Sequence, residues 1–148
     1  MTQIEGFEAL FAMLPLERAM PRLLVVEPGP EDAVAWVEAA ETIPAVKAAL
    51  WLYVDELEKA HQIVQDVHTP TGAFLHAIVH RREGDFWNSK YWYRQAGHHP
   101  VIDAVVHYEP YDLVDRAQVA GAANPADLIA LQRAEWKAIL DYAVQEGG

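Results

Sequence analysis

The stretch that decides the fold runs from Pro44 to Val67 and reads PAVKAALWLYVDELEKAHQIVQDV. Its apolar residues recur at alternating spacings of three and four, which is the period of one face of an α-helix. Pro44 suits the first turn, because the N–H that proline lacks has no helical partner there. We therefore expect one long helix over residues 44–67, whose apolar stripe faces a core. The stripe consists of Val46, Leu50, Tyr53, Leu57, Ala60, Val64 and Val67.

A second helix is predicted directly after this one, over residues 70–83. Thr69 can cap its first turn with the side-chain oxygen, and Pro70 fits the first helical position. Gly84 follows the last predicted turn, where a left-handed residue commonly ends a helix. The short connection predicts that the helices over 44–67 and 70–83 pack antiparallel.

The remaining chain also indicates mostly helices joined by short loops. Asp85 is a candidate cap for a helix over 86–96 that Gly97 ends, and Asn124 with Pro125 is expected to begin the last helix. Helices are also expected over residues 5–13, 31–40 and 110–120. Residues 101–106 can be helical or extended, and residues 23–26 can form an isolated extended piece. We therefore expect an all-α fold, an irregular helical bundle that forms a single domain over residues 1–148.

Composition limits the function and location of the chain. The chain has 148 residues, a net charge of −11 and no cysteine. The negative charge argues against binding to nucleic acid or to an anionic membrane surface. The lack of cysteine excludes disulfides, thiolate metal sites and a cysteine nucleophile. No apolar run is long enough to span a membrane and the first residues do not resemble a secretory signal, so we expect a cytoplasmic protein.

The segment HAIVHRREGDFWNSKYWYRQAGHH, residues 76–99, differs from the rest of the chain. It has four basic and two acidic residues, so its net charge is +2 in a chain of −11. It also holds four of the seven histidines and five of the fifteen aromatic residues. Donors, titratable groups and flat rings are typical of a site for a polar ligand. The functional segment is therefore expected within about residues 50–101.

Three residues of the predicted helix 70–83 have the spacing of metal ligands. His76, His80 and Glu83 lie at positions i, i+4 and i+7 and so point within roughly 60° of one another. Together they can bind a divalent metal and leave one position open. His61 can join from the preceding helix, which makes His61, His76 and His80 candidate catalytic residues. Two alternatives remain: partly buried histidines with structural hydrogen bonds, or catalysis without a metal.

Basic and aromatic side chains of the same segment suggest an anion site. Guanidinium groups hold carboxylate or phosphate with paired donors, best where rings exclude water. The alternative is that the arginines pair with some of the 22 acidic residues and that most rings are core. Arg82 falls on the side of its helix that carries the apolar residues, and Arg81 lies outside that side. We therefore expect Arg82 to be the more buried of the two and to pair with an acid or with the carbonyl end of a helix. The candidate ligand-binding residues are Arg81, Arg82, Asn88, Trp92, Arg94, His98 and His99.

Several of these motifs resemble a family of small uncharacterised proteins from bacteria and fungi. The similarity is carried by the LWL run at 50–52, by FLHAIVHRREGDF at 74–86, by NSKYWYR at 88–94 and by GHHPV at 97–101. It covers residues 48–102 well and the termini loosely. The resemblance implies one functional site in this segment and no particular reaction, because the family has no established activity.

Two classes of function follow from these residues. The first is a pocket, in an enzyme or a binding protein, for a small polar or anionic molecule; if a metal is bound, hydrolysis by a metal-activated water is the expected reaction class. The second is a non-enzymatic homodimer or partner interface, in which tryptophan, tyrosine and arginine are also enriched. A plainer alternative is that the segment serves only as core.

Overall fold

The fold is all-α, as predicted from the sequence. The computed structural model describes residues 6–147, and among these it contains helices and no strand. Leu23–Val26, a possible extended piece, forms no strand. The helices are α1 (Glu8–Met13), α2 (Glu31–Ala39), α3 (Pro44–Tyr53), α4 (Leu57–Val64), α5 (Pro70–Glu83), α6 (Phe86–Ala96), α7 (Pro100–Ala104), α8 (Pro110–Ala120) and α9 (Ala126–Gly147).

The boundaries of α5 and α6 follow the predicted capping residues. The Thr69 hydroxyl accepts a hydrogen bond from the Gly72 N–H at 3.0 Å, and Gly84 ends α5 with a φ of 89°. The Asp85 carboxylate then accepts one from the Asn88 N–H at 3.3 Å at the start of α6. A side-chain oxygen at the first turn pairs an N–H that has no helical partner, so these boundaries are encoded locally.

The prediction of one long helix over residues 44–67 is wrong, because α3 ends at Tyr53 and α4 starts at Leu57. Asp55 has a φ of 60° between them. Its N–H bonds the Leu52 carbonyl at 3.1 Å, and the Glu56 N–H bonds the Trp51 carbonyl at 3.0 Å. This pair of bonds is a Schellman motif, in which the left-handed residue is usually glycine. Aspartate adopts this conformation more readily than most residues, but the sequence gives no glycine to indicate it.

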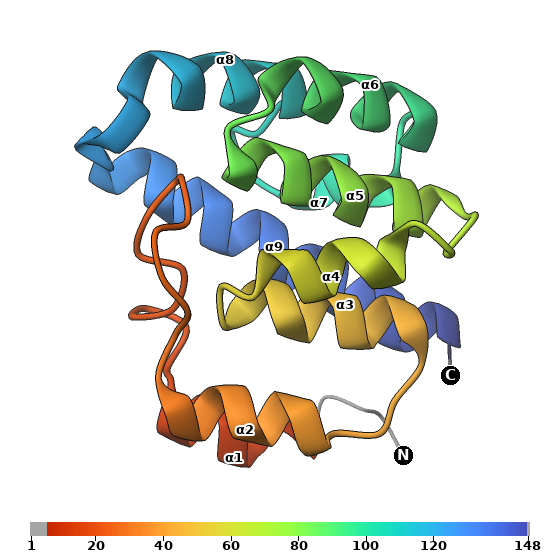
Figure 1. Ribbon diagram of the computed structural model, residues 1–148. Coiled ribbons are helices and arrows are strands. Elements are labelled where there is room, and N and C mark those ends of the chain that lie inside the picture. The colour runs from red at the N-terminus through yellow and green to blue at the C-terminus, as the bar shows by residue number, and fades with distance from the viewer. Residues whose placement is uncertain (1–5, 148) are drawn as a thin grey trace.

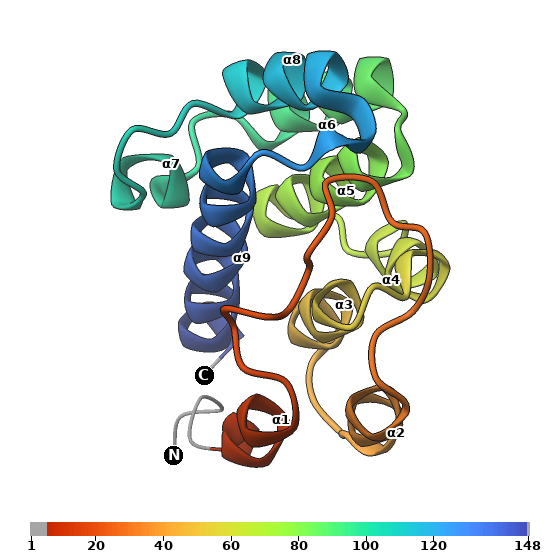
Figure 2. The same ribbon diagram turned by 90° about the vertical axis from the view of Figure 1, so that its left-hand side faces the viewer.

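Successive helices from α3 to α6 reverse direction, and α9 runs along the other side of α3 (Figure 1). The predicted antiparallel packing onto α5 therefore belongs to α4. α3 lies in the centre, and α5 is buried along its length from Thr71 to Arg82 between α4, α6 and α9 (Figure 2). The Trp136 indole N–H joins α9 to α3 through the Ala49 carbonyl at 2.7 Å.

Two further expectations concern the C-terminal half. Residues 101–106, which were expected to be either helical or extended, contain both conformations. α7 covers Pro100–Ala104, and Val105 is extended. Asn124 does not cap α9: it has a φ of 51°, and its side-chain oxygen accepts a hydrogen bond from the distant Leu23 N–H at 2.9 Å. That tertiary bond occupies the atom that a cap would use, so the prediction of a capping Asn124 is wrong. Among the described helices, none has the length and apolar character needed to cross a membrane.

Candidate functional site, a histidine cluster

The predicted approach of His61, His76 and His80 is confirmed. α4 supplies His61 and α5 supplies the other two, which lie one turn apart on the same face. The His61 ring centroid is 5.0 Å from that of His76 and 5.0 Å from that of His80, and the last two are 4.9 Å apart. One nitrogen of each ring lies within 4.8 Å of one nitrogen of each other ring. Two sequence-distant helices thus bring three nitrogen ligands together.

Glu83 takes a different place from the one predicted for it. It was expected as a metal ligand beside His76 and His80, but its carboxylate oxygens lie against ring nitrogens: 3.5 Å from Nδ1 of His61 and 3.1 Å from Nδ1 of His80. A carboxylate on Nδ1 favours the tautomer that carries the proton there, which leaves the other ring nitrogen, Nε2, free to bind a metal. The geometry therefore supports Glu83 as a residue that orients two histidines.

Asp85 and Asn88 extend this acidic edge. The Asp85 carboxylate lies 3.6 Å from Nδ1 of His80, and the Asn88 side chain donates to it at 2.7 Å. The hydrogen bonds from Asn88 lower the pKa of the Asp85 carboxyl. Asn88 thus contacts the cluster through Asp85. From the sequence, Asp85 was expected to cap the helix or to pair with an arginine, and its contact with His80 was not predicted.

Burial keeps two of the histidines neutral. It lowers the pKa of His76 to about 4, and the charges of His80 and His61 act in the same direction. Burial also lowers the pKa of His80, against the opposing attraction of Glu83. Neutral imidazole is the form that binds metal or accepts a proton. At neutral pH both rings therefore have the protonation state that a ligand needs.

Trp92 closes one side of the cluster. Its ring stacks on that of His76 with the centroids 4.0 Å apart and the planes inclined by 14°. Trp92 also lines a cavity of about 320 Å³ between the end of α4, the start of α5 and α6, together with Thr69 and Gln95. Trp92 of α6 therefore contacts both the His76 ring and that cavity.

Arg81 lies elsewhere than predicted. It was expected outside the buried arc of α5, but it is fully buried. Its guanidinium pairs with Glu135 of α9 at 2.9 Å and donates to the Tyr93 hydroxyl at 2.7 Å. The Tyr93 and Tyr108 hydroxyls in turn donate to the same Glu135 carboxylate. α6 and α9 cover this side of α5, which the pattern of one helix alone does not reveal.

Arg82 is buried and paired, as predicted, but it is not more buried than Arg81. It lies 2.7 Å from the Asp55 carboxylate and donates to the Leu52 carbonyl, near the end of α3, at 3.2 Å. A third bond runs to the Arg22 carbonyl at 2.9 Å. Both arginines therefore have protein partners on other elements and are not available to anchor an anion at the histidine cluster.

The other predicted ligand-binding residues make separate contacts. Arg94 is exposed, and His98 is exposed with a ring nitrogen 3.0 Å from Asp103. His99 is buried, accepts a hydrogen bond from the Val101 N–H at 3.2 Å and lies 3.1 Å from the Thr71 hydroxyl. The structure thus gathers the histidines, Trp92 and Asn88, but does not bring these three residues into the cluster.

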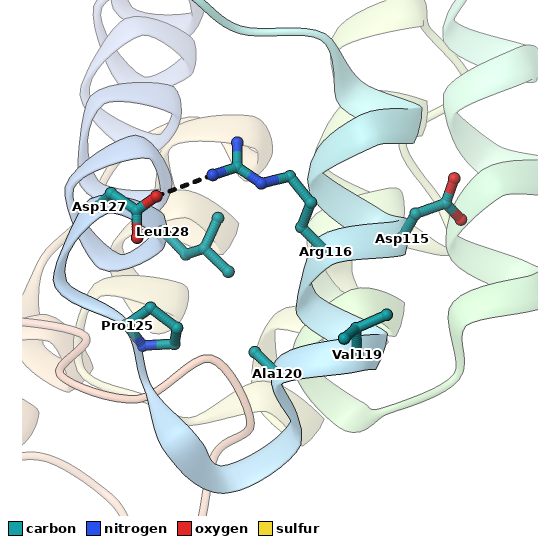
Figure 3. Close-up of a pocket in the computed structure, with 7 residues that line it drawn as sticks. All are labelled: Asp115, Arg116, Val119, Ala120, Pro125, Asp127 and Leu128. Atoms are coloured by element: carbon teal, nitrogen blue, oxygen red, sulfur yellow. Dashed lines mark hydrogen bonds and ion pairs between the residues drawn. The ribbon is translucent and has the colours of Figure 1, made fainter.

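A separate hollow of about 520 Å³ lies between α8 and the start of α9 (Figure 3). Arg116 reaches across it to Asp127 at 2.8 Å, and Leu128 and Ala120 form its apolar wall. None of the site residues predicted from the sequence lines this hollow. It is therefore distinct from the histidine cluster.

Comparison of the chain with protein-family models, curated proteins and solved structures finds no match. The resemblance to the bacterial and fungal family therefore stays a prediction.

Proposed function

We propose that His61, His76 and His80 bind a divalent transition metal, with Zn²⁺ as the best fit, and that the bound ion activates a water molecule for hydrolysis of a small polar substrate. The observation that carries this proposal is that three imidazole rings lie together and that the Glu83 carboxylate lies beside Nδ1 of two of them, His61 and His80. Three histidines are a known ligand set of catalytic zinc sites, in which water takes the fourth position.

The distances fit such an ion after a small closure. With Zn–N bonds of about 2.1 Å, the ligand nitrogens of a tetrahedral ion lie about 3.4 Å apart. The ring nitrogens of this cluster are at most 4.8 Å apart. Movements of about 1 Å among the three rings, of which His61 is partly exposed, would bring the nitrogens to bonding distance. Glu83 and Asp85 supply negative charge beside the ion.

Metal binding is tested with protein purified without a nickel column and treated with a chelator. Titration with Zn²⁺ is expected to show one ion per chain and to raise the melting temperature, because a ligand that binds only the native state stabilises it. His61→Ala should abolish this response, and the partial exposure of His61 makes the variant tolerable to the fold. His98→Ala, which removes an exposed histidine outside the cluster, is the matched control.

The hydrolytic step is tested separately with the zinc-loaded protein. Chromogenic carboxylic esters and phosphodiesters are suitable probes, and loss of turnover in His61→Ala but not in His98→Ala is expected. Zinc binding without turnover of either probe class would retain the metal site and refute hydrolysis of these substrates. Equal zinc affinity of the native protein and His61→Ala would refute the site itself.

A specific observation also supports a second function, a homodimer interface. Trp87 is 73 % exposed and Tyr91 38 % exposed on the outer face of α6, and their rings stack with the planes inclined by 12°. Exposed aromatic side chains are typical centres of protein interfaces. Light scattering at increasing concentration tests this idea: a dimer that Trp87→Ala makes monomeric would support it, and a monomeric native protein would refute it.

A further inference from the structure

A second candidate site, remote in sequence from the histidine segment, lies along the connection between α1 and α2. A cavity of about 340 Å³ is bounded by this connection and by the end of α3. The connection runs from Leu14 to Pro30 and passes alongside α3 and α9 before it returns to α2 (Figure 2). Irregular connections longer than about 15 residues are uncommon in compact domains and are usually functional or disordered.

This connection is fixed by hydrogen bonds from three other elements. The Arg133 side chain donates to the Ala19 carbonyl at 2.8 Å, and Gln132 donates to the Arg22 carbonyl at 3.0 Å. Arg82 of α5 donates to the same Arg22 carbonyl at 2.9 Å. Near the far end, the Gly29 N–H bonds the Val54 carbonyl at 2.8 Å. The cavity wall is therefore a preformed, ordered surface.

Two residues of the wall have left-handed backbone conformations. Met20 has a φ of 48° and Asp55 a φ of 60°, and both line the cavity. Such a conformation is unfavourable for methionine, by an order of 1 to 3 kcal/mol, and persists only where the surroundings impose it. Strained residues of this kind concentrate at ligand sites. The left-handed conformation of Asp55 belongs to the Schellman motif that ends α3, so only the strain at Met20 points to the cavity independently of its size.

The cavity has charges of both signs and an apolar wall. Asp55, whose side chain is 11 % exposed, lines the cavity with Arg18, Arg22 and Glu27. Asp55 pairs with Arg82 at 2.7 Å, and the Arg22 guanidinium lies 3.6 Å from the exposed Glu27 carboxylate. Burial raises the pKa of the Asp55 carboxyl against the attraction of Arg82 and Arg22. The apolar side chains of Met13, Leu14 and Met20 complete this part of the wall.

We infer that this cavity binds an α-amino acid with an apolar side chain. Its carboxylate would pair with Arg18 and would replace the exposed Glu27 carboxylate on Arg22, since guanidinium groups match carboxylates with two parallel hydrogen bonds. Its ammonium group would meet the Asp55 carboxylate, and its side chain would contact Met13, Leu14 and Met20. The volume lies within the range of about 300–1,000 Å³ that is usual for small-molecule sites.

The test uses the full chain in the presence of a chelator, so that its result does not depend on the metal site. Calorimetric titration with L-leucine is compared with isocaproate, which lacks the amino group, and with isopentylamine, which lacks the carboxylate. L-Leucine is expected to bind and to raise the melting temperature. Each analogue should bind at least about tenfold more weakly, because it lacks one of the two charged groups that would contact Asp55 or the arginines.

Arg22→Ala is the primary variant, because the fold uses the Arg22 carbonyl and the half-exposed side chain is dispensable. It should weaken L-leucine binding at least about tenfold, a loss in the range of one charge-assisted hydrogen bond. Asp55→Asn tests the ammonium contact, and Arg116→Ala, at the hollow beside α9, is the control that should bind normally. Absence of binding by L-leucine, equal binding of either analogue, or unchanged binding by Arg22→Ala would each overturn the inference.

Discussion

Acidification should destabilise this fold through His76 well before most carboxylates are protonated. The pKa of His76 is lowered from 6.5 to about 4 in the folded protein. Between these two values the unfolded chain binds a proton that the folded protein does not, so stability is retained above pH 6.5 and is lost as the pH falls toward 4. Linkage gives a loss of about 2 kcal/mol in the free energy of unfolding between about pH 7 and about pH 5.

The variant that isolates this contribution is His76→Phe, which keeps a flat ring against Trp92 and removes the titrating group. Urea unfolding of chelator-treated protein, followed by circular dichroism, gives the free energy of unfolding at each pH. The native protein should lose about 2 kcal/mol more than His76→Phe over this pH interval. His98→Phe leaves the cluster intact and should follow the native curve. Identical pH dependence of the native protein and His76→Phe would refute the burial argument for this histidine.

Three further predictions concern stability and metal binding. Arg81→Ala and Arg82→Ala should both lower the free energy of unfolding by about 3–5 kcal/mol, since each leaves a buried carboxylate without its partner; a small loss for Arg81→Ala in urea unfolding would contradict its pairing with Glu135. Thr69→Ala should cost about 1 kcal/mol through the lost cap, and Thr69→Ser, which keeps the acceptor, should cost less in the same measurement. Zinc at about a hundred times its dissociation constant should stabilise the native protein by about 2.7 kcal/mol. Acidification to about pH 4, where His76 takes up a proton, should weaken this binding, and an affinity that stays unchanged there would exclude His76 as a ligand.

The sequence predicts the features of this fold that depend on neighbouring residues. Thr69 and Gly84 set the two ends of α5, because the hydrogen bonds of a cap reach no further than the adjacent turn of the helix. The shared direction of His76 and His80 follows from helical spacing alone. These inferences needed no knowledge of what packs against the helix, and the structure confirms them.

The features that the sequence did not predict depend on distant partners. The break at Asp55 contains no glycine, and Arg82 pairs with this aspartate across 27 positions of the chain. Arg81 finds its partner Glu135 in α9 and is buried by helices that its own pattern does not describe. The burial of a basic residue therefore cannot be predicted from the pattern of its own helix, because an acid on another helix can pair with it in the core.

The two arginines connect the stability of the fold to the histidine cluster. On α5 they point about 100° apart, and each points roughly 120–140° away from the face shared by His76 and His80. Arg81 fixes one side of the helix to Glu135 of α9, and Arg82 fixes another side to Asp55 at the end of α3. Rotation of α5 about its axis would break a buried ion pair on one side or the other. Together the pairs hold the third face toward α4, where His61 meets the two histidines.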